Sequence, residues 1–401
     1  PQILRFSYAF LGVRLECAEC HKHPYDQWTQ EDHQGFQTFF DGVQFRQTGS
    51  RGPVQDLKKK LGLTADQDSG GYKRLFASLA HEGTMVPWGE VAVPDWSRGR
   101  RKPRPTNNNP TGRVISPRLL GGSELIAEQY TDPRQPVMDW LTEPDNPYFA
   151  RAMVNRVWAH CFGRGIIDPP DEMMLADRAS SEPLLYYLGA EFGAQGYDLE
   201  WLHREITRSR TYQLSWRPNE TNLADERNFS HAAVRRLPAE VTFDALVFAT
   251  AGEAAQARMC GDADNVKRRM IGFPETSRTA AGGYALKLFG KPARELVCDC
   301  ERSNEPSLLQ TIYLRNDAET LAMLDRTEGW LRELTQRGKD WPNEDREALV
   351  REAWLRTFSR PPSEAETAVG LEQLSAAESV PAGLRELLWA LVNSKEFVLN
   401  H

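Results

Sequence analysis

This chain contains little cysteine. It also lacks a long hydrophobic run and an excess of basic charge. Six cysteines among 401 residues are too few for a disulfide framework, so the fold must depend on its hydrophobic core. No apolar run approaches the ~18 residues that span a bilayer. The net charge of −7 argues against a nucleic-acid-binding protein, because phosphate neutralisation needs a basic surface.

The best-known catalytic signatures are missing as well. The sequence contains no G-x-S-x-G, Walker loop, dinucleotide fingerprint or H-E-x-x-H, so the common hydrolase, kinase and dehydrogenase mechanisms have no support. Hydrophobic residues make up 40% and charged residues 26%, the balance of an ordinary globular protein. A chain of 401 residues has room for two or three domains.

The most informative motif is the C-x-x-C-H pentapeptide Cys17-Ala-Glu-Cys20-His21. Two thiols at this spacing can add across the two vinyl groups of one haem, and the adjacent imidazole can then ligate the iron. We therefore expect haem c to be bound covalently at Cys17 and Cys20, with His21 as the metal ligand. A zinc or iron–sulfur site and a purely structural role are the alternatives.

An aromatic loop follows the motif. Tyr25 and Trp28 are predicted to wall the porphyrin from water, and a hydrogen bond at Nδ1 of His21 would tune the iron. His23 lies too close to His21 in sequence to reach the opposite face of the iron without a sharp reversal of the chain. It is expected either to contact a propionate or to pack.

The group on the far side of the iron distinguishes two kinds of haem site. A methionine or histidine there makes an electron-transfer centre, whereas a vacant position permits chemistry on a bound molecule. The candidates by residue type are Met153, His160, His203 and His231.

One predicted helix carries a stripe of candidate residues. Phe149, Met153, Arg156 and His160 fall at i, i+4, i+7 and i+11, on one face. We expect Arg156 and His160 to point inward. They would lie either in a hydrogen-bonded core or in a catalytic site turned toward the haem.

Cys298 and Cys300 form a second cysteine pair, flanked by acidic residues. Three interpretations compete: a strained disulfide, a thiolate ligand to the haem or another metal, or a four-thiolate zinc site completed by Cys17 and Cys20. The zinc interpretation leaves His21 without a role.

Hydrophobic periodicity predicts a mainly α fold, a multi-helical orthogonal bundle with a small β-containing insertion. Residues 41–122 are rich in Gly, Pro, Asn and Arg, and Met85–Val93 alternates like a strand. We divide the chain into residues 1–45, an irregular and partly β region at 46–122, and a helical domain at 123–401. The main expected helices are Glu31–Phe40, Tyr148–Phe162, Glu182–Gln195, Leu199–Tyr212, Ala239–Ala251, Ser307–Leu314, Ala318–Gln336, Glu344–Phe358, Glu364–Ser375 and Ala382–Asn400.

Several stretches together resemble the two paired, uncharacterised domains of large planctomycete cytochrome-associated proteins. They are Phe10–Asp32, Asn146–Gly165, Ser209–Ser215, Arg235–Glu240 and Cys298–Pro306. The resemblance implies that residues 1–45 are the C-terminal remnant of the first domain and that 123–401 are the second. It also implies a longer polypeptide with a cytochrome c module at its N-terminus.

The same resemblance implies a bacterial protein exported to the periplasm and linked to redox chemistry and polysaccharide breakdown. Its partner is expected to be a cytochrome c module or another redox protein, with the missing N-terminal part as a possible separate chain. No nucleic acid and no membrane span are expected. The resemblance places Asn155, Arg156, His160, Arg235, Cys298, Cys300 and Glu301 in one functional region.

The functional expectation is an exported c-type haem protein that acts as a redox enzyme, peroxidase-like or oxygen-handling. His160 and Arg156 are its candidate catalytic residues, with Cys298 and Cys300 near the cofactor. The two alternatives are an electron-transfer or docking module for a cytochrome and a zinc-stabilised scaffold.

Overall fold

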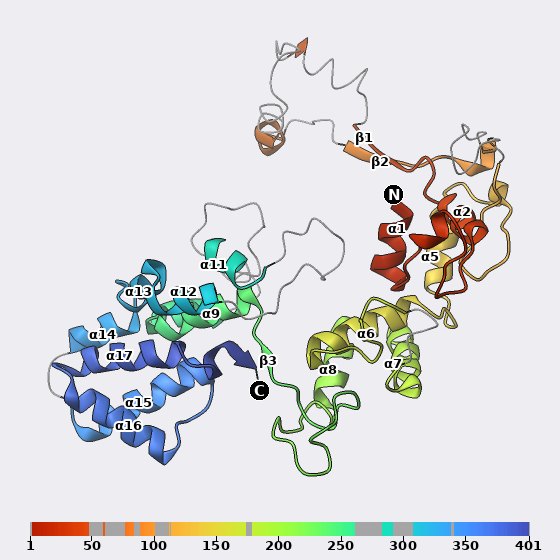
Figure 1. Ribbon diagram of the computed structural model, residues 1–401. Helices are drawn as coiled ribbons and strands as arrows, with labels where there is room; N and C mark the ends of the chain where they lie inside the picture. The colour runs from red at the N-terminus through yellow and green to blue at the C-terminus, as the bar shows by residue number, and fades with distance from the viewer. Residues whose placement is uncertain are drawn as a thin grey trace. The chain divides into compact units, whose positions relative to one another are not determined.

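The computed structural model describes residues 2–47, 59–60, 77–83, 89–100, 112, 114–173, 179–260, 283–291, 308–337 and 341–400. The chain divides into two compact units, residues 1–206 and 207–401, each treated below by itself (Figure 1). The protein is mainly α, as predicted, and its described residues include two small two-stranded sheets. The division between the units falls inside the predicted domain 123–401. Much of the region 46–122, predicted to be irregular and partly β, lies outside the described residues.

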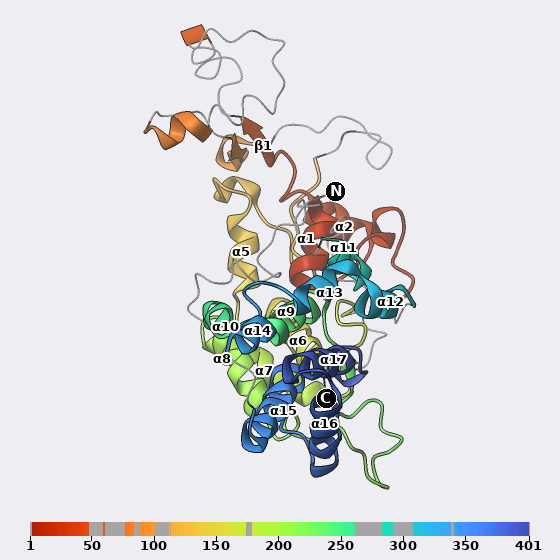
Figure 2. The ribbon, with the colours of Figure 1, turned by 90° about the vertical axis from the view of Figure 1, so that its left-hand side faces the viewer.

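The first unit is mainly helical and contains an antiparallel pair of strands. Its helices are α1 (Gln2–Phe6), α2 (Gln30–Gln37), α5 (Gln135–Leu141), α6 (Phe149–Phe162), α7 (Glu182–Ala194) and α8 (Leu199–Arg208), and its strands are β1 (Gln44–Gln47) and β2 (Gly89–Ala92). Short helical segments are the π-helix η1 (Ser7–Leu11) and the 3₁₀ helices η2 (Cys17–Glu19), η3 (Trp96–Arg98) and η4 (Ala127–Gln129). Helices α6 and α7 pack side by side (Figures 1 and 2).

The small β insertion pairs residues that are far apart in sequence. Strand β1 runs antiparallel to β2, with Gln44 opposite Ala92 and Gln47 opposite Gly89. Strand β2 lies within the predicted strand Met85–Val93, where alternation of apolar and polar residues marks a half-exposed ribbon.

An aromatic core holds the N-terminal segment of this unit in place. The ring of Phe36 lies 6.0 Å from those of Phe6 and Trp140, and 5.9 Å from that of Phe39. Phe36 and Phe39 are almost fully buried. Because Phe36 is on α2 and Trp140 on α5, this packing joins the N-terminal helices to the rest of the unit.

Helix α6 begins and ends where the sequence predicts. Asn146 Oδ1 accepts hydrogen bonds from the backbone N–H groups of Tyr148 (2.9 Å) and Phe149 (3.0 Å), which satisfies donors of the first turn. Gly163 ends the helix with φ +77°, a left-handed conformation that glycine adopts without strain.

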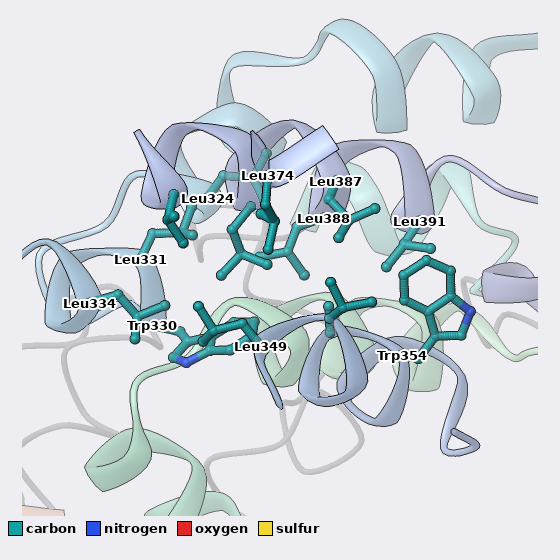
Figure 3. Close-up of a cluster of buried hydrophobic side chains, with 14 of the residues drawn as sticks. Leu324, Trp330, Leu331, Leu334, Leu349, Trp354, Leu374, Leu387, Leu388 and Leu391 are labelled. Carbon is teal, nitrogen blue, oxygen red and sulfur yellow. The ribbon is translucent and has the colours of Figure 1, made fainter. Parts of the chain in front are cut away.

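The second unit contains helices α9 (Ala239–Thr250), α10 (Glu253–Cys260), α11 (Gly283–Leu288), α12 (Leu308–Asn316), α13 (Ala318–Leu324), α14 (Trp330–Arg337), α15 (Asn343–Phe358), α16 (Glu364–Ala376) and α17 (Val380–Val392). After α17 follow the short turn η8 (Glu396–Val398) and strand β4 (Leu399–Asn400), which pairs with β3 (Arg235–Arg236). Leucine and tryptophan side chains of α13–α17 form its main core (Figure 3).

Two predicted helices of this unit are wrong in extent. Ala318–Gln336 is not one helix, because the chain leaves α13 after Leu324 so that Gly329 can form a bridge with Ala251. Ala382–Asn400 is helical only to Val392, since its last residues form β4. Both differences arise from contacts with residues distant in sequence, which periodicity does not report.

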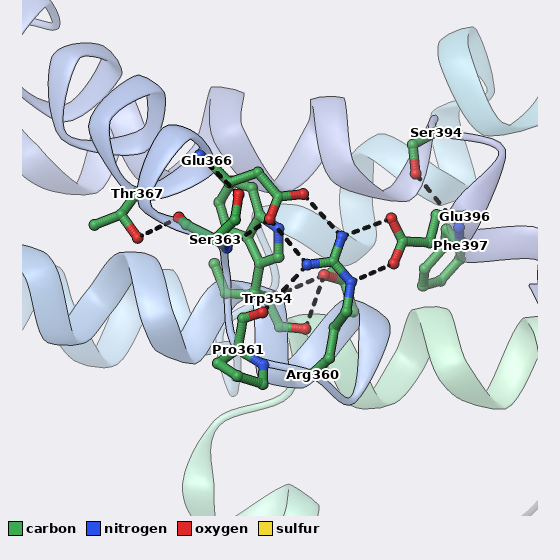
Figure 4. Close-up of polar contacts among 11 residues, drawn as sticks. Trp354, Arg360, Pro361, Ser363, Glu366, Thr367, Ser394, Glu396 and Phe397 are labelled. Carbon is green, nitrogen blue, oxygen red and sulfur yellow. Dashed lines mark hydrogen bonds and ion pairs between the residues drawn. The ribbon is translucent and has the colours of Figure 1, made fainter. Parts of the chain in front are cut away.

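A charged triad joins the loop after α15 to α16 and η8 (Figure 4). Arg360 donates two hydrogen bonds to Glu366 (2.8 and 2.9 Å) and two to Glu396 (2.6 and 2.9 Å). Glu366 also accepts from the backbone N–H of Ser363 at 2.7 Å, which caps α16. The Arg360 guanidinium holds the pKa of Glu366 far below its ordinary value.

Glu366→Gln is expected to lower the stability of the second unit at neutral pH by about 1 kcal/mol, because the variant loses the charge that Arg360 binds. A carboxylate with a depressed pKa stabilises the folded state above its unfolded pKa, and this stabilisation is lost as pH falls through the folded pKa. Wild-type protein should therefore lose more stability than the variant between about pH 5 and pH 2.

Urea unfolding at a series of pH values, with hydrogen exchange read at α16, measures this difference. Glu364→Gln in the first turn of the same helix is the control, because Glu364 is exposed. Equal pH profiles for wild type and Glu366→Gln would contradict the prediction.

Candidate functional site

The C-x-x-C-H motif forms a tight turn with its thiols outside and its alanine inside. The N–H groups of Cys20 and His21 both donate to the carbonyl of Cys17, at 3.4 and 3.2 Å. Ala18, between the two cysteines, is 0% exposed, and so is Leu15 just before the motif. Cys17 and Cys20 are consequently exposed free thiols on a turn that the core holds.

The exposed ring of His21 is oriented by a hydrogen bond with a backbone carbonyl. Its Nδ1 lies 2.7 Å from the carbonyl oxygen of Lys22. Because a carbonyl only accepts, this contact assigns the ring proton to Nδ1 and leaves the lone pair on Nε2. Metal-binding histidines commonly show this pattern, in which the second ring nitrogen donates to a carbonyl. The predicted hydrogen bond at Nδ1 is therefore present.

The two aromatic residues of the loop differ in position. Tyr25 is 71% exposed, and its predicted role beside an attached group stays a prediction. Trp28 is only 2% exposed and packs within the core, with its ring 6.0 Å from that of Tyr148. The expectation that Trp28 forms a wall beside the thiols is not met, because its apolar ring is already buried.

His23 is buried and fixes the loop. The backbone N–H of His23 donates to the carbonyl of Trp28 at 2.8 Å, and its ring Nδ1 accepts from the backbone N–H of Tyr25 at 3.2 Å. Of the two roles predicted for His23, the structure shows the packing role. A neutral ring that accepts at Nδ1 carries its proton on Nε2, which leaves no lone pair for a metal.

Helix α2 braces the motif turn. Gln30 donates from Nε2 to the carbonyl of Glu19 at 3.2 Å. A capping box between Thr29 and Asp32 fixes the start of the helix. Sequence reasoning did not single out His33, which lies on this helix and is 2% exposed. The sequence could have indicated that His33 is buried, because it lies three residues before Phe36 and the two share a helix face.

Arg156 is engaged in a network rather than free in a cavity. Its guanidinium pairs with Asp171 and donates to the carbonyls of Ala9 and Tyr8, the latter at 2.6 Å. The Tyr8 hydroxyl donates to Asp171 at 2.9 Å, and burial together with the Asp171 charge raises the pKa of Tyr8. Arg156 thus holds η1, the turn that leads to the motif.

The predicted stripe on α6 does not face inward along its whole length. Arg156 is half-buried with a side chain 26% exposed, whereas His160 is exposed. The buried face of the helix is formed instead by Ala152, Val154, Asn155, Val157 and Trp158. The inward orientation predicted for His160 is therefore wrong, because the core lies against a neighbouring face. A catalytic role for either residue stays a prediction.

The local packing requires the side chain of Asn155 on α6 and the absence of a side chain at Gly165 after it. Its side chain is 0% exposed and donates to the carbonyls of Ile167 (2.8 Å) and Pro170 (2.9 Å) while accepting from the N–H of Ile167 (2.9 Å). At Gly165 a Cβ atom would lie 2.0 Å from Ile167 O, so only glycine fits. These residues shape the segment that carries Asp171.

The structure does not bring all predicted site residues together. Arg235 belongs to the second unit, and Cys298, Cys300 and Glu301 lie outside the described residues. The four-thiolate zinc site is therefore untested. Within the described ranges, no group of three or more His, Cys, Asp and Glu residues is arranged to hold a metal ion. No described helix is long and apolar enough to cross a bilayer.

Two protein-family models match the segments that carry the C-x-x-C-H motif and helix α6. Residues 133–374, more than half of the chain, match the model of PSD1, a protein family of unknown function (DUF1553). The chain belongs to the PSD1 family. Residues 2–45 match PSCyt2, a second family of unknown function (DUF1549), and the two are the paired domains typical of planctomycete cytochrome-associated proteins. The predicted resemblance is confirmed.

The two family matches are distributed unevenly over the compact units. The PSCyt2 match lies wholly in the first unit, whereas the PSD1 match crosses the division at 206/207. Arg156 of the PSD1 segment thus binds Tyr8 and Ala9 of the PSCyt2 segment. Searches of curated proteins and of solved structures gave no match.

Proposed function

We propose that this PSD1 protein is an exported c-type haem redox protein, with haem attached at Cys17 and Cys20 and ligated by His21. The observation that carries the proposal is the motif turn. It presents two exposed free thiols and an imidazole whose Nδ1 bonds to a carbonyl, which leaves Nε2 for a metal. This donor set fits a covalently attached haem, which supplies one-electron chemistry when bound.

The chain's own residues hold the attachment site steady. Ala18 is buried beneath the thiols, Gln30 bonds the turn from α2, and Arg156 fixes the preceding η1. A rigid attachment site lowers the reorganisation that accompanies electron transfer.

The family supports association with cytochromes, and we propose a cytochrome c module as the redox partner, on the same polypeptide or as a separate chain. Thioether formation on apoprotein thiols takes place outside the bacterial cytoplasm, so the proposal includes export to the periplasm. A contribution to polysaccharide metabolism is part of the proposal through the family resemblance alone.

Of the two redox roles, electron transfer has the better support. A peroxidase-like reaction needs polar groups free to act on a bound molecule, and Arg156 and His160 were the candidates. Arg156 is committed to Asp171 and two backbone carbonyls, and His160 lies on an exposed face of α6. The positions of these two residues therefore give the oxygen-handling alternative less support than electron transfer.

The test is a pyridine haemochrome spectrum of the full chain, produced in a bacterial periplasm that carries the c-type haem maturation machinery. We expect about one haem per chain in the wild type and none in the double variant Cys17→Ala/Cys20→Ala. Cys161→Ala, a half-buried cysteine on α6, should retain the haem and serves as the control. One zinc and no iron in the wild type would overturn the proposal in favour of the zinc scaffold.

A further inference from the structure

A small open pocket in the second unit lies between α10 and α14. Its volume is about 230 Å³, which accommodates one small organic molecule. The polar side chains that line it are Arg258 on α10, Thr327 and Glu328 in the loop before α14, and Arg332, Glu333 and Gln336 on α14. Arg332 and Gln336 are four residues apart, so they share one face of the helix.

The wall of the pocket is fixed by bonds to the backbone at the start of α10. Oε2 of Glu333 accepts from the N–H of Glu253 at 3.2 Å. The N–H of Gly252 donates to the carbonyl of Glu328 at 3.0 Å. Burial lowers the pKa of Arg356, and the charge of Glu333 is among those that oppose this lowering. The carboxylate of Glu333 is therefore engaged by the protein itself.

The four charged side chains of the pocket leave one positive charge without a partner. Arg258 donates to Glu328 at 2.9 Å, so these two charges compensate each other. Glu333 is held by Glu253. Within the part of the chain that the structure describes, the guanidinium of Arg332 makes no hydrogen bond or ion pair. Because Arg332 is exposed, a ligand can reach it without movement of the protein.

We propose that this pocket binds a small hydroxylated carboxylate through Arg332. A planar guanidinium donates two parallel hydrogen bonds to a carboxylate, which a hydroxyl or amide ligand cannot accept in the same way. The amide of Gln336 and the hydroxyl of Thr327 can then bond to hydroxyl groups beside that carboxylate. The inference is independent of the haem, because no residue of the pocket belongs to the C-x-x-C-H turn.

The test is titration of the full chain with gluconate, followed through the backbone amide resonances by NMR. We expect saturable shifts in α10 and α14. The dissociation constant should rise by at least about tenfold in Arg332→Gln, because the charge-assisted contact is lost. Ala255→Leu keeps Arg332 but fills part of the pocket, since Ala255 lines it, and should weaken binding as well.

Two controls isolate the charge and the position of Arg332. Sorbitol has the chain length and hydroxyl groups of gluconate but no carboxylate, so it should cause no saturable shift at the same concentrations. Arg351→Gln on α15 removes the same charge from another exposed position and should bind gluconate as wild type does. Because Arg332 is exposed and unpaired, the unfolding transition of Arg332→Gln should match that of wild type.

The contrary results are equally definite. Absence of a saturable shift with gluconate, or shifts of the same size with sorbitol, would overturn the proposal. Equal affinities in wild type and Arg332→Gln, or equal losses in Arg332→Gln and Arg351→Gln, would do so too. None of these results affects the proposed haem, which the pyridine haemochrome spectrum tests separately.

Discussion

Asn155→Leu is expected to destabilise the first unit by about 4 kcal/mol, because leucine keeps the branching of asparagine at Cγ but cannot hydrogen-bond. In the variant, the N–H and carbonyl of Ile167 and the carbonyl of Pro170 lose the hydrogen bonds that the Asn155 side chain makes. Asn155 itself is 0% exposed, so these bonds lie in the interior of the unit. Each unsatisfied buried group costs about 1–3 kcal/mol.

Hydrogen exchange measured by mass spectrometry localises this loss, because it reports the opening free energy of α6 and of residues 163–173 separately from the second unit. Asn146→Ala at the start of the same helix is the matched control. It removes a cap rather than a buried network and should cost about 1 kcal/mol. If the opening free energy fell by the same amount in both variants, the structural role assigned to Asn155 would be refuted.

Arg156→Met should destabilise the same unit by about 3 kcal/mol, since it removes the cationic partner of a largely buried ion pair and leaves Asp171 only the hydrogen bond from the Tyr8 hydroxyl. The carbonyls of Tyr8 and Ala9 lose their donors as well, so exchange should increase most in η1. Arg156→Lys should recover only part of the loss, because an ammonium cannot reproduce the planar fork that contacts three oxygens.

The control for this variant is Arg164→Met, just after α6. The Arg164–Asp168 pair is 3.4 Å long with side chains 39% and 40% exposed, so its loss should cost only about 0.5 kcal/mol. If Arg156→Met left exchange in η1 unchanged, Arg156 would not be the residue that holds this turn.

Local chemistry explains which parts of the fold the sequence predicts. Helix α6 follows from Asn146-Pro147 and Gly163, because capping and left-handed termination depend on residues at the helix ends themselves. The exposed C-x-x-C-H turn and the Nδ1 hydrogen bond of His21 likewise involve only neighbouring residues.

The sequence does not reveal which distant residues a side chain contacts in the folded protein. The helical pattern leaves Arg156 on α6 either in a hydrogen-bonded core or in a catalytic site, and its partners Tyr8 and Ala9 lie far away in sequence. Trp28 could equally cover a haem or fill a core, and only the position of Tyr148 decides between them. The break between α13 and α14 depends in the same way on the bridge from Gly329 to Ala251.

The aromatic core of the first unit takes side chains from both family segments, which constrains how a gene that encodes the two segments can evolve. Phe36, from the PSCyt2 segment, and Trp140, from the PSD1 segment, have ring centroids 6.0 Å apart in one hydrophobic cluster. Recombination between the two coding segments would divide that cluster and expose both halves to water. A descendant that exchanges one segment must therefore inherit a compatible version of the other, so we expect the pair to be transmitted as a single block.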